Sequence, residues 1–322
     1  MRNNHNHIHN HNHIHNGVVF HNPGLHMVVN VYQLQYANKE AQGWGDFLRG
    51  SVCLFQICRS LGLAFDIDVR NHPWGAFLAR PEAQIPATAL LNPGSVRWYP
   101  DSNYQSVSMQ EFRKDPGFRD RFVSYLNQVH PAGGGVHFLY CNAVPHYEGV
   151  QAPVRLFLQP RLRLSDAMRA IVTETMRARG LRPRGYSVVH VRTGDARWKG
   201  ASTGHTEVPL IRVLRVLERQ LHHGRRDGSR IPCVLLSDHD GVKRACQERF
   251  PWMQIGLYPV AHAGQGGTAE AMKNTVLDFV LLTQAQRILC LTPFNWGSGF
   301  SEYAARLYQV PYQCVVLGRG LG

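Results

Sequence analysis

The sequence contains no long hydrophobic run, and this absence narrows its class. None of its 322 residues belongs to an apolar stretch of about 18 residues, the length that a transmembrane helix needs. The N-terminus also lacks the apolar core of a secretion signal. We therefore expect a cytoplasmic protein with no membrane span.

Several common catalytic signatures are missing as well. There is no G-x-x-x-x-G-K-[ST] phosphate loop, no H-E-x-x-H zinc helix and no G-x-S-x-G nucleophile elbow. The glycines at 43 and 45 do not complete a dinucleotide fingerprint, because Leu48 stands where the third glycine would be. These absences exclude the commonest ATPases, metalloproteases, hydrolases and dehydrogenases.

Cysteines are few and never form a C-x-x-C pair. The seven are Cys53, Cys58, Cys141, Cys233, Cys246, Cys290 and Cys314. Most have apolar neighbours, and an odd number favours reduced, buried thiols in a cytosolic protein over a disulfide framework. We expect no zinc site.

Acidic residues are scarce. Asp and Glu number 22 against 35 Lys and Arg, for a net charge of +13 with histidine neutral. Residues 155–199 alone carry 11 basic side chains and three acidic ones. Such a surplus attracts polyanions, such as nucleic acid, anionic membrane or a phosphorylated ligand, although it is equally typical of a solvated basic face. Residues 155–184 show no aromatic platform and no known module, so nucleic acid is not the expected partner.

Residues 3–16 are low in complexity, with histidine at nearly every second position. Because such a tract cannot bury a core, we expect residues 1–26 to form a disordered tail. Its histidines could bind divalent metal loosely, without a specific metal site.

Beyond this tail, strand and helix patterns alternate. Apolar runs typical of strands lie at 27–35, 63–69, 136–142, 186–192, 232–238, 253–258, 287–292 and 312–318. Helical patterns cover 46–61, 109–115, 118–129, 165–179, 208–222, 241–249, 269–284 and 298–309. The alternation predicts an α/β protein with parallel sheets. We expect two facing Rossmann-like domains, 27–180 and 181–322, with a cleft between them.

Unusual polar residues follow several of these strands. His190 and Arg192 end one strand, Ser237 and Asp238 end the next, and residues 293–298 follow a later one. Residues 43–46 precede the first long helix. In an open parallel sheet, ligands bind beyond the carboxyl ends of the strands. These polar residues together therefore predict a single binding site beyond the strand ends.

Two of these residues, Arg192 and Ser298, have a chemistry that suits a diphosphate, and four of them have a plainer alternative. The planar guanidinium of Arg192 can pair with two phosphate oxygens, but it could also form an inter-domain salt bridge. Ser298 would open a helix, where backbone N–H groups favour an anion, or it could be a simple cap. His190 could be an ordinary strand-end histidine. Asp46 could be the N-cap of its helix.

Four segments, in order, resemble the rhizobial nodulation fucosyltransferases and the related α-1,6-, α-1,2- and protein O-fucosyltransferases. They are GWGDFLRGSVCLFQICRSLGLAFDID, HVRTGD, VLLSDHDGVKRACQERFP and NTVLDFVLLTQAQRILCLTPFNWGSGFSEYAARL. The first resembles a Gly-x-Gly-Asp turn into a helix, and the second a His-x-Arg strand end. The last two are similar to a strand–acid–helix segment and to an L-D-x-x-x-L helix followed by a serine turn. Residues 70–160 resemble no named motif.

The resemblance implies a GT-B fold and an inverting, metal-independent transfer of fucose from GDP-fucose to a glycan hydroxyl, with no cofactor beyond this donor substrate. By position, Arg192 would hold the β-phosphate and Ser298 would touch a phosphate. Asp278 would accept hydrogen bonds from guanine. The set implied to face the donor is Gly43, Gly45, His190, Arg192, Asp238, Asp278 and Ser298. The domain 27–180 would serve the acceptor and 181–322 the nucleotide sugar.

A base would take the proton of the acceptor hydroxyl, although a very dissociative transition state could dispense with a strong one. Asp46 and Asp195 are the favoured carboxylates, with Glu207 a further one. The chain departs from the family pattern where Thr193 replaces a second arginine and His239 replaces a second acid. These departures leave the donor sugar open. A catalytically inactive binder of a nucleotide or glycan and a basic nucleic-acid-binding protein remain the alternatives.

Overall fold

The computed structural model describes residues 14–15, 18–19, 26–36, 39–79, 96–99, 115–129, 135–193, 210–225 and 231–317. Within the expected N-terminal tail it describes only β1 (Ile14–His15) and β2 (Val18–Val19), which pair antiparallel. The rest of residues 1–25 lies outside the described part. None of the helices described here combines the length and the apolar character needed to cross a membrane.

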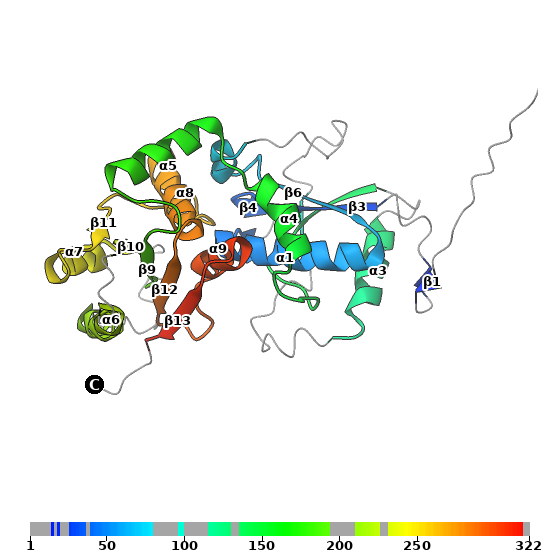
Figure 1. The fold of residues 1–322 in the computed structure, drawn as a ribbon. Helices are drawn as coiled ribbons and strands as arrows, with labels where there is room; N and C mark the ends of the chain where they lie inside the picture. Colours follow the sequence, from blue (N-terminus) through cyan, green and yellow to red (C-terminus); the bar gives the residue numbers. More distant parts are fainter. Residues whose placement is uncertain are drawn as a thin grey trace, which may run out of the picture. The chain divides into compact units, whose positions relative to one another are not determined.

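A parallel sheet of five strands forms the C-terminal half (Figure 1). Its strands are β9 (Ser187–Val191), β10 (Cys233–Ser237), β11 (Gln254–Ile255), β12 (Arg287–Thr292) and β13 (Tyr312–Val316). They lie in the order β11-β10-β9-β12-β13, and each pairs parallel with its neighbours. In chain order this is the doubly wound arrangement 3-2-1-4-5, whose direction of winding reverses between β9 and β12. The reversal opens a crevice at the carboxyl ends of these two strands, where ligands bind in such sheets.

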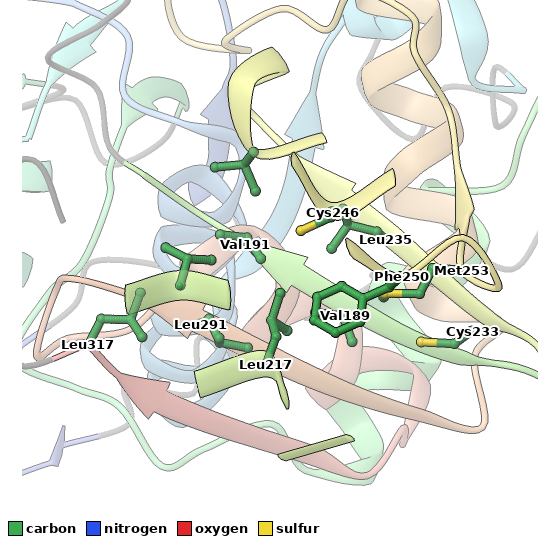
Figure 2. Close-up of a cluster of buried hydrophobic side chains, with 12 residues drawn as sticks. Val189, Val191, Leu217, Cys233, Leu235, Cys246, Phe250, Met253, Leu291 and Leu317 are labelled. Carbon is green, nitrogen blue, oxygen red and sulfur yellow. The ribbon is translucent and has the colours of Figure 1, made fainter. Parts of the chain in front are cut away.

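Helices accompany this sheet in sequence. They are α5 (Asp166–Ala178), α6 (Leu210–Arg225), α7 (Asp240–Arg249), α8 (Ala269–Thr283) and α9 (Gly299–Tyr308). Figure 2 shows the apolar cluster in which one face of the sheet meets α6 and α7. Val189 and Leu235 from the strands pack there with Leu217 and Cys246 from the two helices. Because neighbouring strand residues point to opposite faces, His190 lies on the other face, toward α9.

A second parallel sheet lies in the N-terminal half. It consists of β3 (His26–Val31), β6 (Ala64–Asp68), β7 (Arg97–Trp98) and β8 (Gly135–Tyr140), in the order β6-β3-β8-β7. The long helix α1 (Trp44–Leu61) joins β3 to β6, and α3 (Phe118–Val129) precedes β8. Most of α1 is buried, as its apolar pattern predicts. At Gly50, a Cβ atom would lie 1.7 Å from the carbonyl oxygen of Cys141, so only glycine fits there.

Several elements were not expected from the sequence. They are the hairpin of β4 (Gln35–Tyr36) and β5 (Lys39–Glu40), the 3-10 helix η2 (Pro73–Phe77), strand β7 and the helix α4 (Ala152–Arg161). α4 contains Pro160, and because proline normally interrupts a helix, this residue hid the helical pattern of 152–161 in the sequence. The strand predicted over 27–35 ends at Val31, before the turn into the hairpin. The helix predicted over 109–115 falls almost entirely outside the described residues.

Contacts divide the chain into two compact units whose bounds differ from the predicted boundary at residue 180. One unit combines 1–32, 50–68 and 82–149, and the other combines 33–49, 69–81 and 150–322. The second unit gains its early segments through contacts with C-terminal elements. Trp44 and Trp74, for example, stack at 4.2 Å between ring centroids and both meet the ring of Phe279 edge-on.

The cysteines differ from the prediction at one position. All seven are free, and six are buried, but Cys314 on β13 is exposed. Because β13 ends the sheet, the side chain of Cys314 lies at an edge. Among the described residues, no group of three or more His, Cys, Asp or Glu side chains could hold a metal ion.

Candidate functional site

A pocket in the second unit brings eight of the nine predicted site residues together. They are Gly43, Gly45, Asp46, His190, Arg192, Asp238, Asp278 and Ser298. The ninth, Asp195, lies outside the described residues, as does Glu207. The pocket encloses about 750 Å³ with its open mouth included, a size that suits a small ligand. The structure thus brings these eight positions together beyond the strand ends, and their roles toward a ligand stay predictions.

Strand β9 supplies His190, and Arg192 follows directly after the end of the strand. The backbone N–H of Arg192 donates to the carbonyl of Leu291, which continues the β9–β12 pairing to the strand end. Its guanidinium carbon lies 5.5 Å from the centroid of the Phe294 ring. Phe294 in turn stacks on Trp296 at 4.8 Å. The cationic side chain therefore lies at the pocket wall against an aromatic pair.

His190 lies deeper than Arg192 and is neutral. Its Nδ1 shares a hydrogen bond of 2.9 Å with the hydroxyl of Ser301 on α9. Burial, together with the positive charge of Arg192, lowers the pKa of His190 to about 3. The imidazole therefore contributes hydrogen bonding and no positive charge at neutral pH. It ties the end of β9 to the first turn of α9.

Ser298 precedes α9 and is completely buried. It occupies the N-cap position, as predicted, but its side chain makes no cap hydrogen bond. Its hydroxyl has no hydrogen-bond partner among the described residues. The first N–H groups of a helix also lack intrahelical partners. A buried hydroxyl and a helix N-terminus thus meet at the pocket, an arrangement that suits an anion.

The N-terminus of α1 lies against that of α9. A Cβ atom on Gly45 would lie 2.1 Å from the carbonyl carbon of Gly299, so these two backbones touch. Gly45 is therefore required by helix contact, where the sequence suggested close approach to a ligand. Gly43 has ordinary space around it, because a Cβ atom there would lie 3.6 Å from its nearest neighbour. Two helix N-termini consequently converge on one side of the pocket.

Asp46 is not the N-cap of α1. The helix begins at Trp44, and the N–H of Asp46 already donates to the carbonyl of Gly43 at 3.0 Å. The Asp46 side chain lies in the first turn, where it pairs with Arg49 at 2.6 Å. Arg49 thereby fixes the direction of this carboxylate beside the pocket.

Asp238 fixes the segment that follows β9. Its carboxylate accepts hydrogen bonds from the backbone N–H of Thr193, at 3.0 Å, and from the Thr193 hydroxyl, at 3.1 Å. Thr193, where the resemblance implies a second arginine, thus has a local role. His239 likewise caps α7, because its Nδ1 accepts the N–H of Gly241 at 2.8 Å.

Asp278 lines the pocket from α8. The hydroxyl of Tyr258 donates to its Oδ1 at 2.6 Å. Burial raises the pKa of Asp278 to about 6, although the bond from Tyr258 and the charges of Lys243 and Arg179 oppose this rise. Near neutral pH the carboxyl group is therefore mainly ionised but close to its titration range.

One residue that supports the pocket and was not found from the sequence is His72. His72, before η2, accepts the N–H of Trp74 at Nδ1 and donates from Nε2 to the carbonyl of Ala263, at 2.7 Å. Burial lowers the pKa of His72 to about 4, consistent with this neutral form. Ala263 belongs to the pocket lining. Because its partner is 191 residues away, no local pattern could have indicated this contact.

The comparisons with known proteins agree with this topology. Two crystal structures of NodZ α-1,6-fucosyltransferase match this chain, one soaked with GDP-fucose and one co-crystallised with GDP. Each match has a TM-score of 0.50 and 16% identity, and it covers 87% of this chain and 92% of the NodZ chain. A selenomethionine structure of fucosyltransferase NodZ from Bradyrhizobium matches with a TM-score of 0.50 and 17% identity, over 87% and 91%.

The chain has a fucosyltransferase-like fold. The predicted α/β, GT-B class is thereby confirmed. At this level of identity the likeness concerns the fold alone. No family model matches the chain, and no curated protein matches its sequence.

Proposed function

We propose that this protein is an inverting, metal-independent glycosyltransferase that moves fucose from GDP-fucose to a glycan hydroxyl. One observation carries the proposal: a single pocket is lined by Arg192, by two helix N-termini and by the hydroxyl of Ser298, which has no hydrogen-bond partner among the described residues. The pocket lies at the carboxyl ends of the strands, where nucleotides bind in doubly wound sheets. The fold shared with NodZ, one crystal structure of which was soaked with GDP-fucose, supports this donor.

In the proposed reaction, the acceptor oxygen bonds to C1 of the sugar while the bond from C1 to the β-phosphate oxygen breaks. Negative charge grows on the departing GDP. Arg192 and the N-terminal N–H groups of α9 would stabilise that charge, because such donors are fixed in place before the reaction begins. One donor of this kind is typically worth about 3 kcal/mol.

The acceptor proton requires a base, and Asp46 and Asp195 are the proposed carboxylates. Asp46 lines the pocket and is held by Arg49. Asp278 would accept hydrogen bonds from guanine, while His190 and Asp238 would shape the donor site. A glycan as the acceptor and location in the cytoplasm stay predictions.

Two other functions remain to be separated from this one by experiment. A catalytically inactive binder would use the same pocket to hold a nucleotide or glycan without transfer. A nucleic-acid-binding protein would use the basic segment 155–199. Its binding to DNA or RNA would be tight and would weaken steeply with salt.

A thermal-shift panel of GDP, UDP, ADP and their sugar conjugates, followed by a transfer assay with GDP-fucose and glycan acceptors, tests the proposal. We expect the largest rise in melting temperature with GDP and GDP-fucose, and release of GDP in the presence of an acceptor. Stabilisation by GDP with no transfer would favour an inactive binder. No stabilisation by any nucleotide would contradict the proposal.

A further inference from the structure

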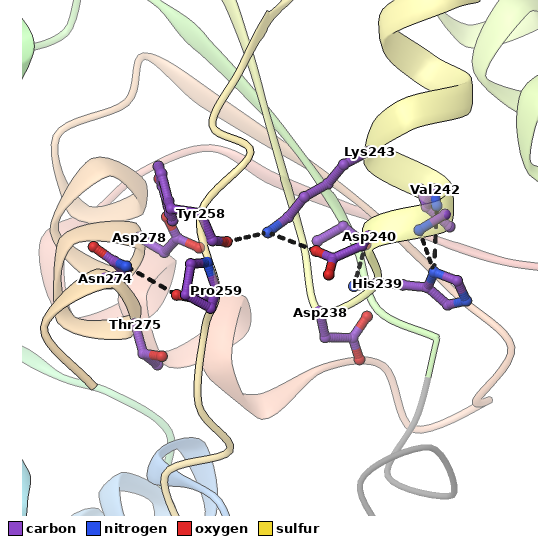
Figure 3. Close-up of polar contacts among 12 residues, drawn as sticks. Asp238, His239, Asp240, Val242, Lys243, Tyr258, Pro259, Asn274, Thr275 and Asp278 are labelled. Atoms are coloured by element: carbon purple, nitrogen blue, oxygen red, sulfur yellow. Dashed lines mark hydrogen bonds and ion pairs between the residues drawn. The ribbon is translucent and has the colours of Figure 1, made fainter. Parts of the chain in front are cut away.

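Lys243 is a buried lysine that none of the sequence motifs explains. It lies on α7 and is 1% exposed. A buried ammonium group is costly unless it is paired. Its Nζ donates to the backbone carbonyl of Tyr258 at 2.9 Å and lies 3.7 Å from a carboxylate oxygen of Asp240 (Figure 3). It also lies 5.4 Å from the centroid of the Tyr258 ring. Lys243 is thus directed at the segment that follows β11.

That segment, residues 258–261, has no regular secondary structure of its own. α8 holds its other side: the side-chain amide of Asn274 donates to the carbonyl of Pro259 at 2.9 Å, and the N–H of Ala261 donates to the hydroxyl of Thr275 at 2.8 Å. Val260 and Ala261 line the pocket. The backbone wall of the pocket is therefore fixed between Lys243 and α8.

The charge of Lys243 also acts on Asp278. Three groups from different elements favour its ionised form: the Tyr258 hydroxyl at 2.6 Å, the ammonium of Lys243 on α7 and the guanidinium of Arg179 at the end of α5. Burial opposes them. An ionised carboxylate can accept two N–H donors, whereas a protonated one accepts fewer and donates instead. The state of Asp278 therefore decides which base edge it can bind.

We propose that Lys243 is a positioning residue for the nucleobase: Lys243 holds the 258–261 wall in place and keeps Asp278 ionised, so that the Asp278 carboxylate accepts the N–H groups of guanine. This inference rests on the proposed function, because it assumes that the base of the donor lies against Asp278. Lys243 itself does not line the pocket and acts through Tyr258 and Asp278. Loss of its charge should therefore change how GDP binding depends on pH, and loss of its contacts alone should not.

The sign of the effect follows from Asp278. GDP binding needs the carboxylate, so affinity should fall as the pH drops through the pKa of about 6. Without the ammonium of Lys243, the pKa of Asp278 rises and the fall begins at a higher pH. A rise of one unit would make the affinity deficit of the variant about fivefold larger at pH 6 than at pH 9. The terminal phosphate of GDP titrates in the same range in every variant, so the informative quantity is the difference between variants.

The experiment is a calorimetric titration of GDP into the full chain between pH 5.5 and 9. The variants are Lys243→Met, Tyr258→Phe and Asp278→Asn. Lys273→Met is the matched control, because Lys273 pairs with Glu270 at 2.5 Å on α8 and does not line the pocket. We expect Lys243→Met to lose affinity mainly below pH 8, Asp278→Asn to lose the fall at low pH, and the control to match the parent protein.

Tyr258→Phe keeps the inference testable if Lys243→Met does not fold. It removes only the hydroxyl that donates to Asp278, so it should shift the pH profile in the same direction. A pH-independent loss of affinity in Lys243→Met, or an unchanged profile in Tyr258→Phe, would overturn the inference and leave the proposed function intact. Failure of the parent protein to bind GDP at any pH would overturn both.

Discussion

The hydroxyl of Ser298 is the clearest sign of a ligand at the scale of single residues. It is completely buried and unpartnered within the described part of the chain. A buried polar group without a hydrogen bond typically costs about 1–3 kcal/mol of stability. Proteins keep such groups at sites where a ligand supplies the missing partner, and a phosphate oxygen would do so here.

Ser298→Ala should therefore weaken binding without loss of stability. Because the hydroxyl makes no cap hydrogen bond, its loss should leave the free energy of unfolding unchanged or raise it by about 1 kcal/mol. GDP affinity should fall about fivefold or more, as one hydrogen bond is lost. Denaturant unfolding and calorimetry measure the two effects.

Ser165→Ala is the matched control, since the Ser165 hydroxyl does cap α5 by accepting the N–H of Met168. This variant should lose about 1 kcal/mol of stability and bind GDP normally. A Ser298→Ala protein that is destabilised like the control, with unchanged GDP affinity, would show that Ser298 is a simple cap.

Local rules identified Arg192 and Ser298 because strand ends and helix starts can be read from a few neighbouring residues. The same rules could not identify His72 or Lys243. Their partners, Ala263 and Tyr258, lie in loops whose positions depend on the whole fold. The sequence placed Gly45 in the loop facing the donor, but no local pattern could reveal its contact with Gly299, far along the chain.

At the scale of elements, the pocket depends on the contact between α1 and α9. Each helix contributes its N-terminus, and the Gly45–Gly299 contact sets their separation. The apolar patterns predicted both helices close to their observed bounds, Trp44–Leu61 and Gly299–Tyr308. The strand order decides which pairs of helices touch, and no local pattern in the sequence reveals that order.

Gly45→Ala should push the two N-termini apart. The added methyl carbon would lie 2.1 Å from backbone atoms that cannot rotate away. We expect a loss of about 1–3 kcal/mol or more in stability, as in overpacked cores, and loss of GDP binding. Thermal unfolding with and without GDP measures both.

Gly43→Ala provides the comparison for stability, because its new methyl group would meet no neighbour closer than the Asp46 carboxylate at 3.6 Å. Its melting temperature should stay near that of the parent protein. Equal stability of the Gly45→Ala and Gly43→Ala proteins would contradict the close helix contact.

At the scale of the whole molecule, the two compact units are discontinuous in sequence. The second unit takes in residues 33–49 and 69–81 besides 150–322. The alternation of strands and helices predicted the α/β class, but it could not show that Trp44 and Trp74 pack with α8. A linear boundary at residue 180 therefore separated elements that pack together.

A fragment of residues 181–322 should not fold cooperatively by itself. It would lack Trp44, Trp74 and α5, and the apolar surface of Phe279 would be exposed. We expect no sharp thermal transition and strong binding of a hydrophobic dye, compared with the full chain. A fragment with a cooperative transition and GDP binding would show that the predicted boundary is a true domain boundary.

The central claim is that Arg192 holds the β-phosphate of the donor. Its most direct test is a calorimetric titration of GDP, and of GMP, which lacks the β-phosphate. Both nucleotides are titrated into the parent protein, Arg192→Ala and Arg192→Lys. If Arg192 holds the β-phosphate, the alanine variant should lose about tenfold or more in GDP affinity, the value of a charge-assisted hydrogen bond. Lysine should recover little, because it cannot make the paired contact. GMP affinity should change less than about twofold. Equal losses for both nucleotides, or none for GDP, would contradict the account.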